Sequence, residues 1–323
     1  MIEKIKLDLF KLKSKKDLKS VYHFFKKSSS KWFNDNECPK DEFFQRKKCP
    51  LCNSDTSKEA FRVDGFSYHE CSDCESLYTK PHLRDGVIDD LYSEGLYQTY
   101  QDNLVKKGKK LRRDSLDERK FFQIKGFINK NSNPTLLDIG CGSGTFLDAC
   151  KQNGWQVEGV DPSPSDSKLV LENYNIKVHQ ADFNKLKFNK TFDVITLWGV
   201  LEHLSNPIAT IKKAKELLNK DGMLVFEVPS ANCLISEYLK KNNFSPTRYL
   251  ESGRHNIFFS KKLIRQIAEN FNLKIEYLET NGFDIQTILL EEFENEITDK
   301  IINIQDTLND LLLGDHYRIF MRK

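Results

Sequence analysis

The sequence lacks a long hydrophobic run and a strong net charge. No stretch of about 18 apolar residues occurs, and lysines interrupt each short apolar run near the start (MIEKIKLDLFKLKSKK), so neither a membrane span nor a signal-peptide core is expected. Fifty Lys and Arg residues against 47 Asp and Glu residues leave a net charge of +3, which excludes a strong overall attraction to nucleic acid. We therefore expect a cytoplasmic protein whose charged contacts are local.

Internal repeats and low-complexity segments are also absent, and only nine prolines and 15 glycines occur among 323 residues. This composition excludes a repeat architecture and a disordered chain. Apolar residues make up 39% of the sequence, which suffices for a folded core. The length suits about two domains of roughly 150 residues each.

Changes in composition divide the chain into four expected segments. Residues 1–46 form a basic amphipathic helical segment, in which the lysine-rich residues 1–31 have apolar side chains at helical spacing. The lysine-rich stretch either lies on an anionic surface, here the inner face of the membrane, or packs on the body with its lysines in solvent. Residues 47–81 carry two cysteine pairs, residues 82–130 predict a helical linker or lid, and residues 131–323 alternate between strands and helices.

Three further features each allow two interpretations. Three tyrosines either belong to a lid over a ligand or pack between helices in the ordinary way: Tyr92, Tyr97 and Tyr100. The basic run 106–113, with Arg248 and Arg254, either receives a phosphate or carboxylate of a substrate or is surface charge. The amphipathic stretch 285–313 either covers the site or supports dimerisation.

Eight cysteines occur, and four of them are paired in sequence. The pattern is C-x2-C, eighteen intervening residues and C-x2-C, formed by Cys49, Cys52, Cys71 and Cys74. In a reducing compartment this spacing is typical of a zinc site with four thiolate ligands. Four protein ligands close the coordination shell, so we predict a structural zinc ion and not a catalytic one.

Strands and helices alternate after the linker NSNP, which predicts parallel strands joined by crossover helices in a doubly wound α/β sheet. The expected strands are 135–139, 156–160, 176–179, 192–197, 223–228, 273–279 and 316–321, and the expected helices include 145–153, 164–174, 207–218 and 261–270.

A glycine cluster lies where the first of these strands meets a helix, in the segment LLDIGCGSGT. Gly140, Gly142 and Gly144 let the backbone turn sharply and approach a ligand closely. Asp161 follows the second strand, at the place where a carboxylate accepts hydrogen bonds from ribose hydroxyls. Asp182 follows the third strand and could accept from an adenine amine, with Phe183 as an apolar face for the ring. These residues predict a nucleoside ligand.

The runs LLDIGCGSGTFLDACKQNGWQVEGVDPSPSDSK, QADF, FDVITLWGVLEHLSNP and LLNKDGMLVFEVPS resemble class I S-adenosylmethionine-dependent methyltransferases. The resemblance implies a Rossmann-like seven-stranded sheet of order 3-2-1-4-5-7-6, whose last strand is antiparallel. It also implies that Asp138 lies beside the methionine amino group of the cofactor. The implied cofactor site contains Asp138, Gly140, Gly142, Gly144, Asp161, Pro162, Asp182, Phe183 and Trp198.

The cysteine quartet before this core is similar to the arrangement in small-molecule methyltransferases of bacterial sugar and surface-polysaccharide pathways. That resemblance implies O-methylation of a small sugar-like or phosphorylated acceptor that is linked to a nucleotide or a lipid. A hydroxyl acceptor needs a base, and the sequence offers His203, after the fourth strand, and His255, after the fifth. Each is alternatively a structural residue, a loop cap for His203 and a packing residue for His255.

Two other functions remain open from the sequence. The first is methylation of an RNA base, because some ribosomal RNA methyltransferases also carry a zinc module before this core. The segment Trp198-Gly199-Val200-Leu201 and the near-neutral charge argue against it. The second is a cofactor-binding scaffold without turnover.

Overall fold

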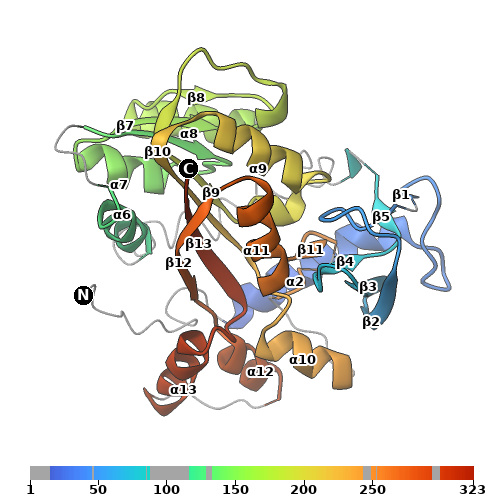
Figure 1. Cartoon of the computed structure of the whole chain (residues 1–323). Helices are drawn as coiled ribbons and strands as arrows, with labels where there is room; N and C mark the ends of the chain where they lie inside the picture. The colour runs from blue at the N-terminus through green and yellow to red at the C-terminus, as the bar shows by residue number, and fades with distance from the viewer. Residues whose placement is uncertain are drawn as a thin grey trace.

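The computed structural model describes residues 15–45, 47–84, 86–87, 116–128, 133–242, 249–251, 253–292 and 299–323. A seven-stranded sheet has the order β12-β13-β10-β9-β6-β7-β8 (Figure 1). In chain order its strands are β6 (Thr135–Ile139), β7 (Gln156–Val160), β8 (Val178–His179), β9 (Phe192–Trp198), β10 (Leu218–Pro229), β12 (Lys274–Thr280) and β13 (His316–Arg322). β13 is antiparallel to β10 and β12, and the remaining neighbours are parallel. The predicted doubly wound sheet, its strand order and its antiparallel last strand are confirmed.

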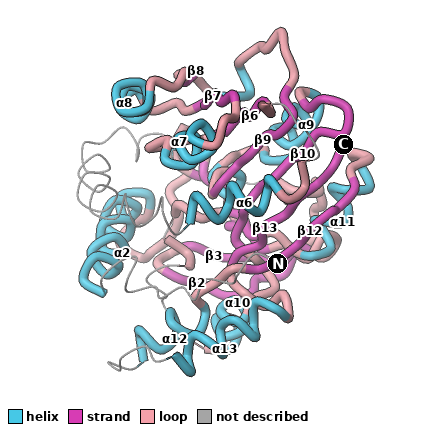
Figure 2. The backbone as a smooth tube through the Cα atoms, turned by 90° about the vertical axis from the view of Figure 1, so that its left-hand side faces the viewer, coloured by secondary structure: helices cyan, strands magenta, loops and turns pink. Residues whose placement is uncertain are grey.

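The two faces of this sheet are covered by different helices (Figures 1 and 2). Because side chains alternate along a strand, Leu136 packs with one set of helices and Leu137 with the other. The first set is α6 (Glu118–Lys125), α7 (Thr145–Gln152) and α8 (Pro164–Tyr174), and the second set includes α9 (Pro207–Glu216) and α11 (Lys261–Asn270). The sheet core is therefore buried on both sides, as near-continuous apolar strands require.

Helix starts coincide with capping residues in the sequence. Ser163 accepts a hydrogen bond from the backbone N–H of Asp166, and Pro164 occupies the first turn of α8. Ser260 caps α11 in the same way, by accepting from the backbone N–H of Leu263. Such caps satisfy N–H groups that the first helical turn leaves without partners, which explains why these two boundaries were predictable.

The cysteine-bearing segment is joined to the main sheet's domain by strand pairing. A four-stranded sheet has the order β11-β4-β3-β2, in which β2 (Ser57–Val63), β3 (Phe66–Cys71) and β4 (Leu77–Thr79) come from this segment. The fourth strand, β11 (Ile257–Phe258), comes from the segment between α10 (Leu234–Lys241) and α11. β1 (Phe44–Gln45) pairs separately with β5 (His82–Leu83). Residues 47–81 and the region around His255 therefore form one structural unit.

The N-terminal helix α2 (Lys15–Ser29) packs on the same unit, followed by the short helix η1 (Ser30–Trp32). Phe25 of α2 is 1% exposed, and both Tyr22 and Lys26 bind the carboxylate of Asp64. This is the arrangement expected if the basic segment packs on the body. Residues 1–14 lie outside the described residues, so membrane association of 1–31 stays a prediction.

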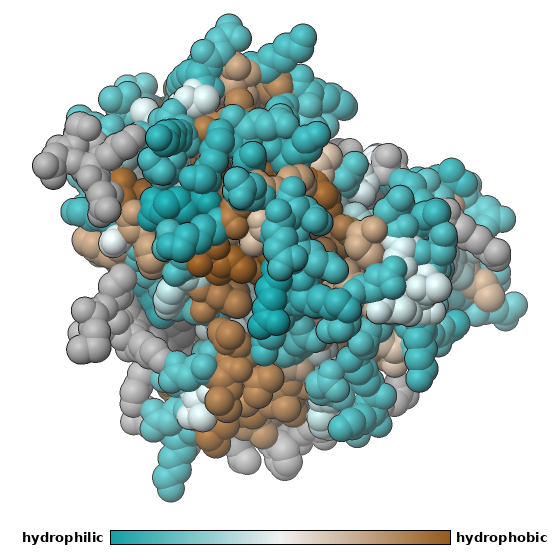
Figure 3. Space-filling view, in the orientation of Figure 1, coloured by the Kyte–Doolittle hydropathy of each residue, from teal (hydrophilic) through white to brown (hydrophobic). Residues whose placement is uncertain are grey.

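The amphipathic stretch 285–313 contains two helices, α12 (Asp284–Glu292) and α13 (Asp299–Asp310), which contact each other. They lie beside the ends of β12 and β13 in Figure 1. Among the described residues, no helix has both the length and the apolar character needed to cross a membrane. The face drawn in Figure 3 is mostly hydrophilic, with an apolar strip running from its middle toward its lower edge.

Candidate functional site

The predicted glycine loop leaves β6 at its carboxyl end and enters α7. Gly140 and Gly144 both have φ of +71°, and a Cβ on either would come within 2.6 Å of a valine side chain. Gly142 has φ of +49°, and a Cβ there would meet nothing within 4 Å. The outer two glycines are therefore required by the fold, whereas Gly142 faces open space, where a ligand can approach the backbone.

Asp161 follows β7 and is only 8% exposed. Its carboxylate accepts hydrogen bonds from the backbone N–H groups of Gly142 at 2.8 Å and Ser163 at 2.9 Å. Burial raises the pKa of Asp161, and these two N–H groups oppose the shift. Each oxygen keeps a further lone pair, so the carboxylate can brace the loop and still accept from two hydroxyls of a ribose.

Asp138, in β6, is 2% exposed and accepts a hydrogen bond from the hydroxyl of Thr196 at 2.6 Å. Burial raises the pKa of Asp138 to about 7, although the Thr196 hydroxyl acts in the opposite direction. A bound ammonium group would favour the charged carboxylate here. The residue therefore fits its implied place beside the amino group of a methionine moiety.

The remaining predicted cofactor residues lie at the ends of neighbouring strands. Pro162 is exposed beside Asp161. Asp182 is also exposed and caps the short helix η4 (Phe183–Lys185) by accepting from the backbone N–H of Asn184 at 2.9 Å. Phe183 is 5% exposed, with Lys213 Nζ 4.8 Å from its ring centroid. Phe183 is thus part of the buried core at this end of the sheet, and Asp182 lies on the exposed surface beside it.

Trp198, at the end of β9, contacts residues of this cofactor side and of a second region of the site. Its ring packs edge-on against Phe146, with centroids 5.2 Å apart. Lys120 Nζ lies 4.3 Å and the Arg318 guanidinium carbon 5.6 Å from the Trp198 ring centroid. Trp198 therefore contacts both the glycine-loop helix α7 and two cations, Lys120 and Arg318.

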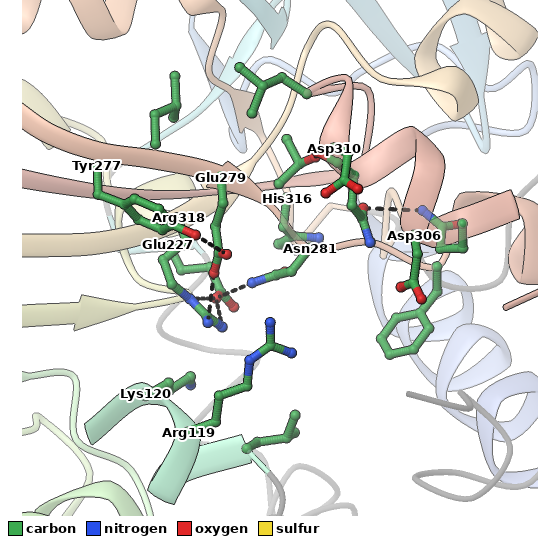
Figure 4. Close-up of a pocket in the computed structure, with 18 of the residues that line it drawn as sticks. Arg119, Lys120, Glu227, Tyr277, Glu279, Asn281, Asp306, Asp310, His316 and Arg318 are labelled. Carbon is green, nitrogen blue, oxygen red and sulfur yellow. Dashed lines mark hydrogen bonds and ion pairs between the residues drawn. The ribbon is translucent and has the colours of Figure 1, made fainter. Parts of the chain in front are cut away.

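A cavity of about 330 Å³ is lined in part by these two cations (Figure 4). It is lined by α6, by the ends of β10, β12 and β13, by the loop after β12 and by α13. Most of the lining is polar, and includes Arg119, Lys120, Glu227, Glu279, Asn281, Gln305, Asp306, Asn309, Asp310, His316 and Arg318. Open α/β sheets bind ligands at the carboxyl ends of their strands, which is where β10 and β12 bring this cavity.

Arg318 is the centre of a charge network in this cavity. Its guanidinium binds Glu227 at 2.7 Å and Glu279 at 3.1 Å, and donates to the side-chain oxygen of Gln123 at 2.6 Å. Asn281 donates to the same Glu227 carboxylate at 2.8 Å. Burial alone would raise the pKa of Glu227, but Arg318 holds that pKa well below its usual range. The network therefore fixes charged and hydrogen-bonding groups in set positions before any ligand binds.

Arg119 faces this network, as Figure 4 shows. Its Nε is buried and has no hydrogen-bond partner among the residues that the structure describes. Burial lowers the pKa of Arg119, and the nearby Arg318 adds to the shift. A buried guanidinium N–H without a partner is costly, so this site is suited to an oxygen or an anionic group of a ligand.

The two predicted bases lie together, with ring centroids 5.3 Å apart. His203 belongs to the short helix η5 (Leu201–His203), and His255 comes shortly before β11. Burial lowers the pKa of His203 well below its usual range and lowers that of His255 to about 4. Burial also raises the pKa of the neighbouring Glu202 to about 7. Neither ring is among the described residues that line the cavity.

His316 is the histidine that lines the cavity, and its sequence context did not single it out. Its Nδ1 lies 2.6 Å from Oδ1 of Asp315, whose side chain is fully buried. Glu227, Arg318 and Arg119 were missed as well. Glu227 could have been found by the rule that identified Asp161, since both stand at the carboxyl ends of buried parallel strands. Nothing in the local sequence around Arg318 marks its role.

The four predicted metal ligands come together as their spacing indicates. The sulfur atoms of Cys49, Cys52, Cys71 and Cys74 all lie within 4.8 Å of one another, and none is in a disulfide. The Sγ distances are 3.7 Å between Cys49 and Cys74 and 3.5 Å between Cys52 and Cys71. Sulfurs about 2.3 Å from a zinc ion in tetrahedral geometry stand about 3.8 Å apart, so the four thiols fit zinc.

Several predicted features lie outside the described residues. These are the three lid tyrosines (Tyr92, Tyr97 and Tyr100), the basic run 106–113 and Arg248. Arg254 is described, and its guanidinium binds Glu251 at 2.6 Å and lies over the ring of Phe25. A substrate-binding role for Arg254 therefore stays a prediction.

Comparisons with known proteins agree with this geometry. Two relatives are named ubiquinone biosynthesis O-methyltransferase. The one from Haemophilus ducreyi is 32% identical over 120 residues, 34% of this chain and 51% of the relative. The one from Pelagibacter ubique is 27% identical over 179 residues, 51% of this chain and 72% of the relative. This chain spans about half the length of the first curated relatives it matches.

Among solved structures, magnesium protoporphyrin IX methyltransferase from Synechocystis PCC 6803, with bound SAH, has a TM-score of 0.50 at 14% identity. The match covers 74% of this chain and 100% of that chain, and it shows the same fold. A family profile described as a methyltransferase domain matches residues 108–278, which is more than half of the sequence. The chain therefore belongs to the methyltransferase domain family, as the resemblance to class I S-adenosylmethionine-dependent methyltransferases implied.

Proposed function

We propose that this protein transfers a methyl group from S-adenosylmethionine to a hydroxyl oxygen of a small, sugar-like acceptor that carries an anionic group. Bacterial glycan biosynthesis uses acceptors of this kind, linked to a nucleotide or a lipid. The observation that carries the proposal is the polar cavity of about 330 Å³ at the carboxyl ends of β10 and β12. Its lining residues Lys120 and Arg318 lie over the ring of Trp198, so the cavity adjoins the predicted cofactor side.

The glycine loop and the strand-end carboxylates support the cofactor half of the proposal. Gly142 gives the ligand access to the backbone, Asp161 is suited to the ribose hydroxyls and Asp138 to the amino group. S-adenosylmethionine supplies an already activated methyl group on a sulfonium. The protein's task is then to align the acceptor oxygen behind that methyl, at about 3 to 3.5 Å, and to take up its proton.

The lining of the cavity supports the acceptor half. Glu227, Glu279 and Asn281 present carboxylate and amide groups of the kind that bind sugar hydroxyls. Arg119 adds a buried donor suited to a phosphate or carboxylate. The name of the curated relatives supports oxygen as the methylated atom. The polar lining favours a hydrophilic acceptor over the ubiquinone precursors that this name implies.

His316 is positioned to act as the base. A carboxylate on Nδ1, here that of Asp315, holds an imidazole in the tautomer whose Nε2 accepts a proton. The assignment of this role to His203 or His255 stays a prediction, and its support is their sequence position after the fourth and fifth strands. A methyl-transfer assay on His316→Gln, His203→Gln and His255→Gln ranks the three, with His316→Gln expected to lose about 100-fold or more in turnover.

A structural zinc ion is the second proposed cofactor, held by Cys49, Cys52, Cys71 and Cys74. The closed set of four thiolates would tie the two cysteine turns together and stabilise the module beside β11. It offers no open position for an acceptor, so the proposed reaction uses no group of this site.

The test of the proposed function is an unbiased screen for methyl transfer from isotope-labelled S-adenosylmethionine. Pools of nucleotide-linked sugars, lipid-linked sugars, quinone precursors and RNA are offered separately to the zinc-loaded protein. We expect label in a sugar pool and loss of that label in Arg119→Gln. Label only in RNA would favour the alternative of base methylation, and label only in quinone precursors would overturn the sugar-like acceptor. Cofactor binding without label in any pool would favour the scaffold.

A further inference from the structure

A second group of metal-binding side chains lies apart from the cysteines. It consists of Glu202 and His203, in η5 after β9, and His255, before β11. One ligand atom from each residue lies within 4.8 Å of the other two. The set contains two imidazoles and one carboxylate, which is a donor set that divalent transition-metal ions bind in proteins.

Both histidine rings are oriented in the way that metal-binding histidines are. His203 Nδ1 lies 2.8 Å from the backbone carbonyl oxygen of Arg254, and His255 Nδ1 lies 2.8 Å from that of Tyr249. Each Nδ1 therefore carries the proton and donates it to a carbonyl, which makes Nε2 the atom with the lone pair. A carbonyl on the far nitrogen of a ligating histidine fixes the ring and raises its basicity.

Glu202 supplies an independent observation. The residue is 2% exposed, and within the described part of the chain its Oε2 has no hydrogen-bond partner. Oε1 of the same carboxylate lies 3.9 Å from His203 Nε2. A buried carboxylate oxygen without a partner carries a large desolvation penalty, which a bound cation removes.

The charged groups around the three side chains leave room for a cation. Glu251 Oε2 lies 3.7 Å from His255 Nε2 and also binds the guanidinium of Arg254. Glu227 and His316 act electrostatically on Glu202 from the cavity side. Two carboxylates thus face the cluster, and each is already paired with an arginine, Glu251 with Arg254 and Glu227 with Arg318.

We propose that Glu202, His203 and His255 bind one divalent transition-metal ion of the Zn²⁺, Fe²⁺, Mn²⁺ or Co²⁺ class. Bonds of about 2.0–2.2 Å require the three ligand atoms to approach to roughly 3.0–3.5 Å, a decrease of up to about 1.5 Å from separations that are now at most 4.8 Å. The ion would join the loop after β9 to the segment before β11. Three protein ligands leave a coordination position for water or an acceptor oxygen. This inference does not rest on the proposed methyl transfer.

The test is cobalt binding to the full chain. Protein stripped of metal is reconstituted with Co²⁺, and the bound metal is counted by elemental analysis and followed by visible absorption. We expect two equivalents, one with the strong thiolate charge-transfer band of the cysteine site and one with only the weak bands of nitrogen and oxygen ligands. A single equivalent, with the thiolate band alone, would overturn the proposal.

The variants Glu202→Gln and His255→Gln separate the two sites. Each should lose the weak bands and one cobalt equivalent while the thiolate band remains, and Glu202→Gln is close enough in shape to preserve the fold. His179→Gln is the matched control, because His179 pairs with Glu158 at 2.8 Å in a different region of the sheet. An unchanged count of two in both Glu202→Gln and His255→Gln would place the second ion elsewhere and refute this site.

Discussion

The cofactor half and the acceptor half of the site are built in different ways. Apart from Trp198 at the end of β9, the cofactor half comes from one contiguous segment, from β6 through η4, in which each strand ends in a turn that carries the functional residue. The acceptor half combines α6, β10, β12, α13 and β13, whose residues are up to about 200 positions apart, as with Arg119 and Arg318. Local backbone geometry thus determines the first half, and tertiary packing determines the second.

The largest expected effect is confined to the cysteine module and leaves the cofactor half in place. Cys49→Ser removes a ligand of the proposed zinc ion, and the module that pairs with β11 should lose several kcal/mol of stability. Hydrogen exchange should rise in β2, β3, β4 and β11, and remain unchanged in β6 and β7. Cys38→Ser is the control, because Cys38 is exposed and outside the cluster. Equal exchange changes in the cysteine module and in the cofactor half would contradict this expectation.

Arg318→Met tests the charge network of the acceptor half. The substitution leaves Glu227 and Glu279 buried without their cation, and breaking a buried pair in this way costs about 3–5 kcal/mol. Chemical denaturation measures the loss. Arg322→Met is the matched control on the same strand, because its ion pair with Glu276 is partly exposed and should contribute at most about 1 kcal/mol. Similar losses of stability in the two variants would show that the buried network contributes no more to stability than a partly exposed ion pair.

Asp138→Asn tests the cofactor half through the pH dependence of the protein's stability. The folded-state pKa of about 7 lies above the usual value of 3.8, so the folded protein binds the extra proton. The stability due to this group is present below about pH 4 and is lost as the pH rises to about 7, at a cost of at most about 4 kcal/mol. Without cofactor, Asp138→Asn should therefore raise the melting temperature at pH 8 and change it little at pH 4. A lower melting temperature at pH 8 would show that the charged form is stabilised in the fold.

The smallest effect concerns Asp182, at the rim of the cofactor half. Its side chain is exposed and caps η4, and asparagine retains the capping oxygen. Asp182→Asn should weaken binding of S-adenosylhomocysteine by less than about tenfold, the loss of one exposed hydrogen bond. Calorimetric titration measures the change. A loss of 100-fold or more would assign Asp182 a larger role in adenine binding.

The sequence predicted those features of the site that depend on neighbouring residues. The glycine loop and the meeting of four cysteines follow from local spacing, whereas the strand order was implied by the family resemblance. All three were found in the structure. Glu227 and Arg318 meet because β13 pairs with β10 over a separation of 91 residues, and no local pattern encodes that register. For the same reason His316 has the sequence context of an ordinary strand residue, although β13 places it at the edge of the cavity.

The central claim is that the glycine loop and Asp161 hold an adenosine-bearing cofactor, and calorimetry tests it most directly. Zinc-loaded protein should bind S-adenosylhomocysteine at one site per chain. In Asp161→Asn the affinity should fall by about 10- to 100-fold, the loss of charge-assisted hydrogen bonds to the ribose, while the fold persists. Absence of binding by the folded wild-type protein, or equal affinity in Asp161→Asn, would contradict the account.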